Sequence, residues 1–371
     1  MHKEKVFVGL SGGVDSSVSA ALLVQANPNN FEKLFGRPTP EGFSGYDVTG
    51  VFIKVWEPPQ EKFQKVCTWR DDRRDAMRVA ATLGIPFVTI DLSAEYKQGV
   101  VDYMIAEYKA GRTPNPDVMC NKMVKFGAFY DWATEQGADY VATGHYARIK
   151  NNQLVMGVDS EKDQTYFIWN ITTEQIKHII FPIGEYQKKE VRKLAEKFGL
   201  ATATKKDSQG LCFIGKLDVK DFLREFIAEK PGEVVTETGE VIGSHGGVMF
   251  YTLGERHGFT IKQKSPKDKP FFVVAKNISN NQLVVSNIPK ESQTQTKSIN
   301  LEDVNWISAR PDNEKKYTCQ FRYHQPLVLC RVENIGDKWK IHFSAPQTSV
   351  TPGQSLVLYD GEICLGGGII A

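Results

Sequence analysis

The first half of the chain alternates short apolar runs with segments of helical periodicity. Runs of strand type occupy residues 6–10, 48–56, 86–92 and 139–143. Helical spacing places Val14, Val18, Ala21 and Leu22 on one face and returns in residues 71–83, 94–109 and 122–136. Strands that alternate with helices form βαβ units, so this half is predicted to be an α/β domain with a mostly parallel sheet between helices.

The second half has a different pattern of apolar and turn residues. From about residue 219 the apolar runs are short, and turn pairs such as Pro231-Gly232 and Asp360-Gly361 are frequent, as is typical of small antiparallel β domains. We therefore predict three domains, at residues 1–217, 218–290 and 291–371. The polar residues 288–298 are a candidate linker. Residues 27–46, rich in Asn, Pro and Gly, are interpreted as a surface loop inserted after the first helix.

The composition indicates where in the cell the protein works, but not which reaction it could catalyse. A net charge of +2 neither demands nor excludes a nucleic-acid partner. The apolar runs fall far short of the ~20 residues of a membrane helix, and the N-terminal residues do not resemble a signal peptide. We expect a cytoplasmic monomer with no membrane partner.

A glycine-rich loop joins the first strand to the first helix. Residues 11–16 read Ser-Gly-Gly-Val-Asp-Ser. Two glycines let the backbone turn tightly, and successive amides at a helix N-terminus bind anionic oxygens. The loop is not a Walker A motif, because no Gly-Lys-Ser/Thr follows. It resembles the loop of the ATP pyrophosphatase superfamily, whose members split ATP between the α and β phosphates. A turn that merely caps a helix is the alternative.

Two of the six cysteines stand in contexts that favour reactivity. Cys120 follows Asn115-Pro116-Asp117 and precedes a helical pattern, where a helix dipole would favour the thiolate. Lys122 and Lys125 add positive charge, and Asp117 could act as general acid or base. Cys212 lies between glycines after Lys205-Lys206. The alternative for each is a packing residue, which we expect for Cys319, Cys330 and Cys364. The absence of a CxxC pair gives a structural zinc site little support.

Taken together, the motifs resemble those of the tRNA-specific 2-thiouridylases over nearly the whole chain. The matching segments are residues 11–16, 106–122, 142–146, 163–167, 206–215 and 351–370. The resemblance implies an N-terminal PP-loop domain (adenine nucleotide alpha hydrolase-like), a small β-rich central domain and a C-terminal β-barrel. It also implies that ATP, with Mg²⁺ as counter-ion, adenylates the C2 oxygen of wobble uridine 34 in tRNA.

The resemblance further assigns roles to individual residues. Cys212 would carry a persulfide supplied by a donor such as a cysteine desulfurase or a sulfur relay protein. Cys120 would be its catalytic partner, with a transient Cys120–Cys212 disulfide. The implied nucleotide contacts are Gly9, Leu10, Ser11, Gly12, Gly13, Val14, Asp15, Ser16, Ile53 and Gly144. The implied tRNA contacts are Asn115, Pro116 and Asp117 at the target base, with Lys162, Asp163, Gln164, Arg322 and Tyr323 elsewhere.

One further basic cluster is ambiguous. Lys188, Lys189, Arg192, Lys193 and Lys197 share a helical segment that suits a phosphate backbone or simply a solvated face.

Two other functions remain open from the sequence. One is a PP-loop, AMP-forming enzyme that acts on a small molecule, but the chain has no recognisable glutaminase domain to supply nitrogen. The other is a nonenzymatic RNA-binding protein, in which the two cysteines would be idle.

Overall fold

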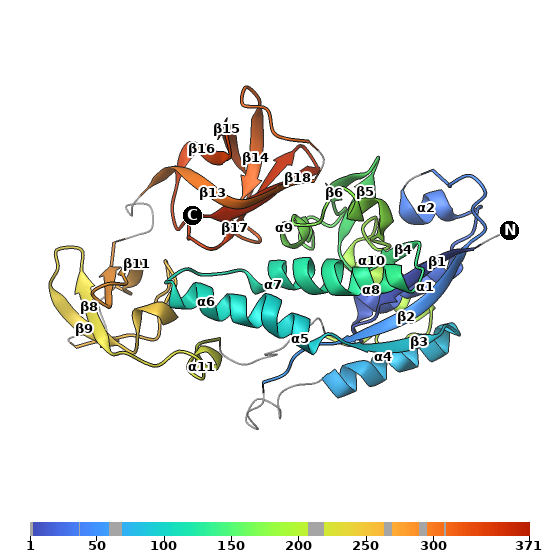
Figure 1. Ribbon diagram of the computed structural model, residues 1–371, viewed down its shortest axis with the longest axis horizontal. Helices are drawn as coiled ribbons and strands as arrows, with labels where there is room; N and C mark the ends of the chain where they lie inside the picture. The colour runs from blue at the N-terminus through green and yellow to red at the C-terminus, as the bar shows by residue number, and fades with distance from the viewer. Residues whose placement is uncertain are drawn as a thin grey trace.

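The computed structural model describes residues 3–36, 38–58, 69–206, 219–262, 269–288, 295–307 and 309–371 (Figure 1). Its strands form three sheets. The predicted domain boundaries near residues 217 and 290 fall outside the described residues and stay predictions.

The N-terminal sheet is parallel, as the alternation of strands and helices predicts. Its strand order is β3-β2-β1-β4-β7. The strands are β1 (Glu4–Gly9), β2 (Tyr46–Lys54), β3 (Phe87–Asp91), β4 (Tyr140–Ala142) and β7 (Ile179–Ile180). Successive side chains of β1 point to opposite faces. Val6 and Val8 pack with residues of the helices at 14–25, 69–83 and 188–197, which cover one face of the sheet. Phe7 packs with residues of the helices on the other face.

Helices cover both faces of this sheet. One face carries α1 (Val14–Gln25), α4 (Trp69–Leu83) and α10 (Lys188–Lys197). The other carries a chain of α5 (Ser93–Tyr96), a π-helix (Lys97–Asp102), α6 (Tyr103–Lys109), α7 (Pro116–Met119), a second π-helix (Cys120–Ala128) and α8 (Phe129–Glu135). The predicted α/β fold is confirmed, but two expected helices are broken into α and π segments.

The insertion at residues 27–46 is more ordered than a surface loop. It contains α2 (Phe31–Phe35), and Phe31, Phe35 and Phe43 are buried. The rings of Phe31 and Phe43 lie 4.6 Å apart and pack near Tyr46 at the start of β2. The aromatic side chains give the segment an apolar core that its Asn, Pro and Gly content concealed.

The central sheet has the order β10-β9-β8-β12-β11. Its strands are β8 (Gly232–Thr236), β9 (Val241–His245), β10 (Thr260–Ile261), β11 (Phe272–Asn277) and β12 (Gln282–Ser286). The short helix α11 (Val219–Leu223) precedes it, and a 3-10 turn spans Val248–Phe250. The pairing of β12 with β8 is parallel, so the sheet is mixed rather than purely antiparallel.

The C-terminal strands close into the expected barrel. The strands are β13 (Thr296–Trp306), β14 (Lys316–Gln320), β15 (Val328–Ile335), β16 (Lys338–Gln347), β17 (Ser355–Asp360) and β18 (Ile363–Ile370). They run β13-β16-β15-β14-β17-β18, and β18 pairs back with β13 to close the ring. Cys319, Cys330 and Cys364 are buried within the barrel strands. Because β13 begins at Thr296, the candidate linker ends earlier than residue 298.

A hairpin of the N-terminal half joins the barrel. It consists of β5 (Ala147–Lys150) and β6 (Gln153–Met156), and Val155 of β6 pairs with Ile363 of β18. The barrel therefore lies over α7 and over α9 (Thr165–Ile168), which a 3-10 helix (Gln175–His178) follows in the chain (Figure 1). Within the described ranges, no helix has the length and apolar character needed to cross a membrane.

Candidate active site

The glycine-rich loop bridges β1 and α1. Leu10 N donates to the Val51 carbonyl at 2.8 Å, which fixes the loop to the neighbouring strand. Ser16 Oγ lies 3.1 Å from Ser11 Oγ and accepts from Ser11 N at 3.2 Å. The N-cap of α1 is Gly13, which has no side chain to occupy the free amides of the first turn. The Ser11–Ser16 hydrogen bonds hold the loop in shape, and no side chain caps the amides of the first helical turn. This arrangement is suited to bind phosphate oxygens.

Gly12 is required where the loop meets α4. Its φ is +75°, in the region that favours glycine, and a Cβ there would overlap the backbone oxygen of Asp72. Gly144, after β4, makes a similar approach. A Cβ at residue 144 would come within 2.6 Å of Ser16 N. The predicted nucleotide residues Gly12, Ser16 and Gly144 are thus brought together.

Asp15 is held by two residues that are distant in sequence. Lys188 Nζ lies 2.8 Å from each carboxylate oxygen, and Tyr146 OH donates to Oδ1 at 2.8 Å. The Lys188 side chain is 14% exposed. Lys188 was expected either on tRNA or in solvent, and the structure instead places it at the phosphate loop.

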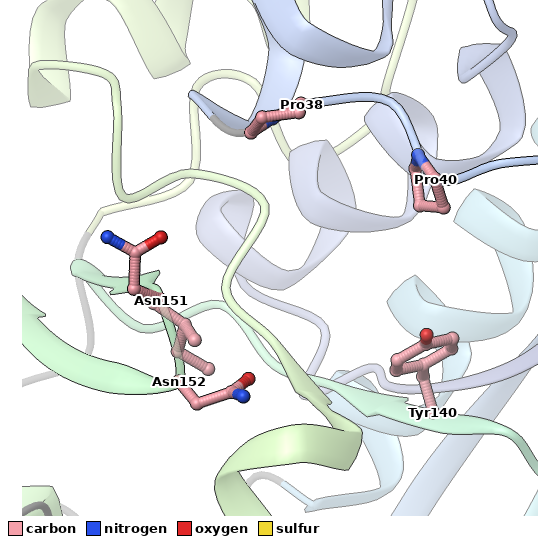
Figure 2. A pocket seen from close by; sticks show the side chains of 6 residues that line it. Pro38, Pro40, Tyr140, Asn151 and Asn152 are labelled. Atoms are coloured by element: carbon pink, nitrogen blue, oxygen red, sulfur yellow. The ribbon is translucent and has the colours of Figure 1, made fainter.

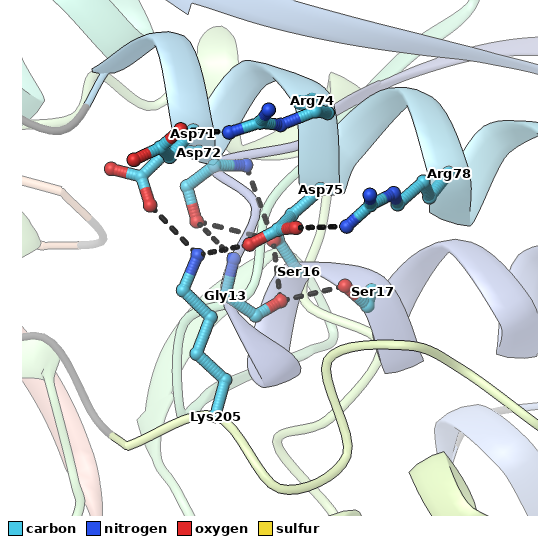
Figure 3. A network of polar contacts seen from close by, with 10 residues as sticks. Gly13, Ser16, Ser17, Asp71, Asp72, Arg74, Asp75, Arg78 and Lys205 are labelled. Carbon is cyan, nitrogen blue, oxygen red and sulfur yellow. Dashed lines mark hydrogen bonds and ion pairs between the residues drawn. The ribbon is translucent and has the colours of Figure 1, made fainter.

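Lys205 is attached to α4 beside the same loop. Its Nζ lies 2.7 Å from both Asp72 Oδ1 and Asp75 Oδ2 (Figure 3). Burial alone lowers the pKa of Lys205, but the hydrogen bonds to the two carboxylates outweigh it and raise the pKa. Arg192 donates to the carbonyls of Ala203 and Lys205, each at 3.0 Å. Arg192 therefore supports the chain here, while Lys189, Lys193 and Lys197 are exposed.

Ile53 and Cys120 belong to the apolar cluster on the other face of the sheet. Ile53, near the end of β2, is partly buried against this cluster, and Cys120 is 4% exposed within it. The helix at Cys120 begins at Pro116, with Asn115 Oδ1 accepting from Val118 N at 3.3 Å. The expected helix start after Cys120 is therefore wrong. The dipole effect falls off within the first turn, so it does not explain a reactive Cys120.

Asp117 and Lys125 are the charged residues with described interactions in the two helical segments that flank and contain Cys120. Burial raises the pKa of Asp117, and the Lys125 ammonium lowers it in part. Lys125 Nζ also lies 3.4 Å from His145 Nε2, whereas Lys122 is exposed. Asp117 is thus a carboxyl group whose proton affinity is raised, which suits acid–base work.

The barrel brings Arg322 and Tyr323 to α9, which a hydrogen bond between Tyr166 and Asn115 connects to the segment before α7. The Tyr323 ring lies 4.4 Å from that of Phe167, and burial, with the Asp163 and Asp159 charges, raises the pKa of Tyr323 to about 12. Burial raises the pKa of Tyr166, which a hydrogen bond with Asn115 and the Arg322 charge partly oppose.

Gln354 fixes this same segment from the barrel side. Its Nε2 donates to the carbonyls of Thr113 and Pro114 at 2.8 and 3.0 Å, and Thr113 N donates to the Pro352 carbonyl at 3.0 Å. Sequence reasoning did not single out Gln354, although it lies in the matching segment 351–370.

Residues 162–164, which are predicted to contact tRNA, differ in their hydrogen bonds and burial. Asp163 accepts from Gly157 N at 2.8 Å and from Thr165 Oγ1 at 2.6 Å, and burial raises its pKa. Gln164 Oε1 accepts from Tyr146 N at 3.0 Å. Both side chains shape the loop between β6 and α9, and Lys162 is half-buried nearby. Cys212 lies outside the described residues.

A separate small pocket lies at the insertion. It has a volume of about 210 Å³ and is lined by Pro38, Pro40, Tyr140, Ile149, Asn151 and Asn152 (Figure 2). None of the predicted site residues lines it.

Known proteins match the chain over nearly its whole length. A family model described as the tRNA methyl transferase HUP domain matches residues 4–35 and 42–216. The tRNA methyl transferase PRC-barrel domain matches residues 220–287, and the aminomethyltransferase beta-barrel domain matches residues 296–370. The tRNA-specific 2-thiouridylase MnmA of Pseudomonas savastanoi pv. phaseolicola is 43% identical over 99% of this chain and 94% of its own. That of Geobacillus thermodenitrificans is 44% identical over 100% and 95%.

The chain belongs to the tRNA-specific 2-thiouridylase MnmA family. The family predicted from the sequence motifs is confirmed. Among solved structures, the U34-tRNA thiolase NcsA from Methanococcus maripaludis is 18% identical over 61% of this chain and 68% of its own, with a TM-score of 0.33. That likeness is too distant to support an argument.

Proposed function

We propose that the chain is a sulfurtransferase that replaces the C2 oxygen of wobble uridine 34 in tRNA with sulfur, at the expense of ATP. The observation that carries the proposal is the match to 2-thiouridylases over the whole chain. The geometry of the phosphate loop and of the Cys120 region supports it.

The first step is adenylation of the uridine. The C2 oxygen attacks the α-phosphorus of ATP, pyrophosphate leaves, and the oxygen becomes part of an AMP leaving group. The loop of residues 9–16, with Ile53 and Gly144, binds the nucleotide. Its amides stabilise the phosphate charge that develops in the transition state. Mg²⁺, when bound with ATP, would offset the phosphate charge, and the Asp15 carboxylate would offer it an oxygen ligand of the type that Mg²⁺ prefers.

The second step is sulfur transfer from Cys212. A donor protein, a cysteine desulfurase or a sulfur relay protein, first leaves a persulfide on Cys212. The terminal sulfur attacks C2, and AMP departs with the original oxygen. The Cys120 thiolate then attacks Cys212 Sγ, which breaks the sulfur–sulfur bond, releases the thiocarbonyl and forms a Cys120–Cys212 disulfide. Alternatively, Cys120 attacks the persulfide first and frees the sulfur as the nucleophile. A dithiol reductant restores both thiols.

Three features of the described residues support this division of labour. Cys120 lies one turn after Asp117, a carboxyl group whose burial raises its pKa. Before the segment that contains Cys212, the chain is attached beside the phosphate loop by Lys205. After it, α11 places Phe222 and Leu223 in the apolar cluster that contains Cys120. The chain thus leaves from beside the proposed adenylation site and returns to the apolar cluster to which Cys120 belongs.

The tRNA is held by residues from two domains. Asn115, Pro116 and Asp117 receive the extruded target base, which must leave its stack to react. Lys162, Asp163, Gln164, Arg322 and Tyr323 contact the rest of the anticodon region. The hydrogen bond between Asn115 and Tyr166, and the closeness of Arg322 to Tyr166, support a continuous surface from the base site to the barrel. We propose that the enzyme works as a cytoplasmic monomer.

One assay tests the proposal. Purified protein is incubated with ATP, a persulfide donor and unmodified tRNA, and the nucleosides are analysed for 2-thiouridine. We expect thiolation that is lost in Cys212→Ser and in Cys120→Ser, while the tRNA-dependent release of pyrophosphate persists in both variants. Full activity of Cys212→Ser would contradict the persulfide role. ATP consumption without tRNA would favour a small-molecule substrate, and tRNA binding without either reaction would favour an RNA-binding protein.

A further inference from the structure

The loop between β6 and α9 reaches the phosphate loop through Tyr146. Gln164, at the end of the β6–α9 loop, forms two hydrogen bonds with the Tyr146 backbone. Its Oε1 accepts from Tyr146 N at 3.0 Å, and its own N donates to the Tyr146 carbonyl at 2.9 Å. The Tyr146 hydroxyl donates in turn to Asp15 Oδ1 at 2.8 Å. One side chain thus lies between a residue proposed to contact tRNA and a residue proposed to bind ATP.

Asp159, near the start of the same loop, makes a second connection to Asp15. Its Oδ2 accepts from Lys188 N at 2.8 Å, where α10 begins, and the Lys188 ammonium lies 2.8 Å from both Asp15 oxygens. Asp159 also shapes the loop itself, because its Oδ1 accepts from Glu161 N at 3.1 Å and its carbonyl accepts from Lys162 N at 3.0 Å. Hydrogen bonds therefore join both ends of the loop to the Asp15 carboxylate.

Tyr146 has little freedom to move independently of these partners. It is 2% exposed and belongs to the apolar cluster that contains residues of α1 and α10. Gly157 of the loop lies so close that a Cβ there would come within 2.9 Å of the Tyr146 carbonyl oxygen. Closely packed interiors transmit displacements. A tRNA that holds the loop would therefore also hold Tyr146, and with it the orientation of the Asp15 carboxylate.

We propose that Tyr146 is a positioning residue that couples ATP binding to tRNA binding. The proposal rests on the function proposed above and concerns its adenylation step. Without tRNA, nucleotide binding must immobilise the loop as well as Asp15, which costs conformational entropy. Bound tRNA has already immobilised the loop, so ATP binds more tightly to the tRNA complex than to the protein alone. By linkage, bound nucleotide tightens tRNA binding by the same factor.

The test measures this coupling factor directly. The probe is an ATP analogue in which a methylene group replaces the oxygen between the α and β phosphates, so that it cannot be split there. Its Kd is measured by calorimetry without tRNA and with saturating unmodified tRNA. In wild type we expect tRNA to lower this Kd by about fivefold or more. In Tyr146→Phe, which removes only the hydroxyl and leaves Asp15 paired with Lys188, the analogue should still bind, and tRNA should no longer change its Kd.

Three further variants make the result specific. Gln164→Met removes the oxygen that accepts from Tyr146 N and should lower the coupling factor, whereas Gln164→Glu keeps an acceptor oxygen and should retain it. A weaker affinity for tRNA in either variant does not affect the factor, because tRNA is kept saturating and the factor is a ratio of two Kd values for the analogue. Tyr186→Phe removes the hydroxyl of a ring that packs against the same apolar cluster and should keep the wild-type factor.

Amide hydrogen exchange adds a readout that a merely structural role of Tyr146 would not produce. Binding of the analogue should slow exchange in residues 157–164 of wild type, because the loop is immobilised, and should not slow it in Tyr146→Phe.

The outcomes separate the two proposals. If wild-type protein forms no 2-thiouridine, the proposed function fails, while the coupling is judged from binding alone. If tRNA leaves the Kd of the analogue unchanged in wild type, or lowers it equally in wild type and Tyr146→Phe, the role proposed for Tyr146 is overturned.

Discussion

The ammonium of Lys188 lies 2.8 Å from both carboxylate oxygens of Asp15. The two residues are 173 positions apart in the chain, yet they meet where α10 packs beside the start of α1. The pair is largely removed from solvent, with side-chain exposures of 14% and 31%. Removal of one partner leaves a poorly solvated charge without its counter-charge.

We expect both partners to be needed for adenylation. Asp15→Ala and Lys188→Met should each lower tRNA-dependent AMP formation by about 100-fold or more, because each removes a preorganised charge from the phosphate site. Lys177→Met is a suitable control, since Lys177 pairs with Glu174 at the surface and surface pairs contribute little. The rates are measured by tRNA-dependent release of pyrophosphate, the product that leaves in the adenylation step. Unchanged ATP consumption in Asp15→Ala would refute the assignment of the loop.

Gly12 should tolerate no side chain. In Gly12→Ala the new methyl group meets the Asp72 backbone and the residue keeps an unfavourable positive φ, so the loop must shift. A displacement of about 1 Å can cost about 100-fold in rate. The matched control is Gly84→Ala, at φ +67° with nothing within 4 Å of its Cβ, which should cost about 1 kcal/mol of stability and leave AMP formation intact. Equal AMP formation by the two variants would contradict this account.

The barrel cysteines should resist alkylation in the folded protein. Contact with Cys330 and burial raise the pKa of Cys319, and burial raises that of Cys364. Thiols react as thiolates, so iodoacetamide at pH 8 should label Cys212 well before Cys319, Cys330 or Cys364. Peptide mass spectrometry distinguishes the sites, and a sample in denaturant should show all of them labelled. Early modification of Cys364 in native protein would disprove the prediction.

Lys276 should make stability depend on pH. Burial lowers its pKa to about 8, which Glu255 partly offsets, compared with about 10.4 for a free lysine. Below pH 8 the buried charge therefore lowers the free energy of unfolding by its full amount. The free energy of unfolding recovers as the pH rises from 8 to about 10.4, where the folded protein has already released this proton. Lys276→Met also loses the hydrogen bond to the Tyr251 carbonyl. The net gain at pH 7 should be on the order of 1 kcal/mol.

Thermal unfolding at several pH values measures this effect. The melting temperature of Lys276→Met should exceed that of wild type at pH 7 and approach it near pH 10. Lys262→Met, which removes an exposed lysine, should follow the wild-type curve throughout. An advantage for Lys276→Met that does not shrink with pH would show that burial of the charge is not its cause.

The sequence by itself determined the features that depend on neighbouring residues. Apolar periodicity fixed the parallel sheet, because the α/β pattern repeats within each strand–helix unit. The strand–loop–helix unit around Gly12 and Gly13 predicted a phosphate-binding loop, since its turn needs glycine locally. The alternation of β14 and β15 predicted that Cys319 and Cys330 are buried. Asn115 and Pro116 are also residue types that favour a helix start at this point. We nevertheless predicted the start after Cys120.

Only the tertiary structure decided which charges meet. Lys188 and Arg192 lie four residues apart on one helix, but one pairs with Asp15 and the other donates to backbone carbonyls. Lys122 and Lys125 lie in one π-helix, but Lys125 alone of these two reaches His145. The physical reason is that the partners of a charged side chain depend on strand order and helix packing, which can join residues as far apart in the chain as Asp15 and Lys188. Local sequence carries no record of those distances.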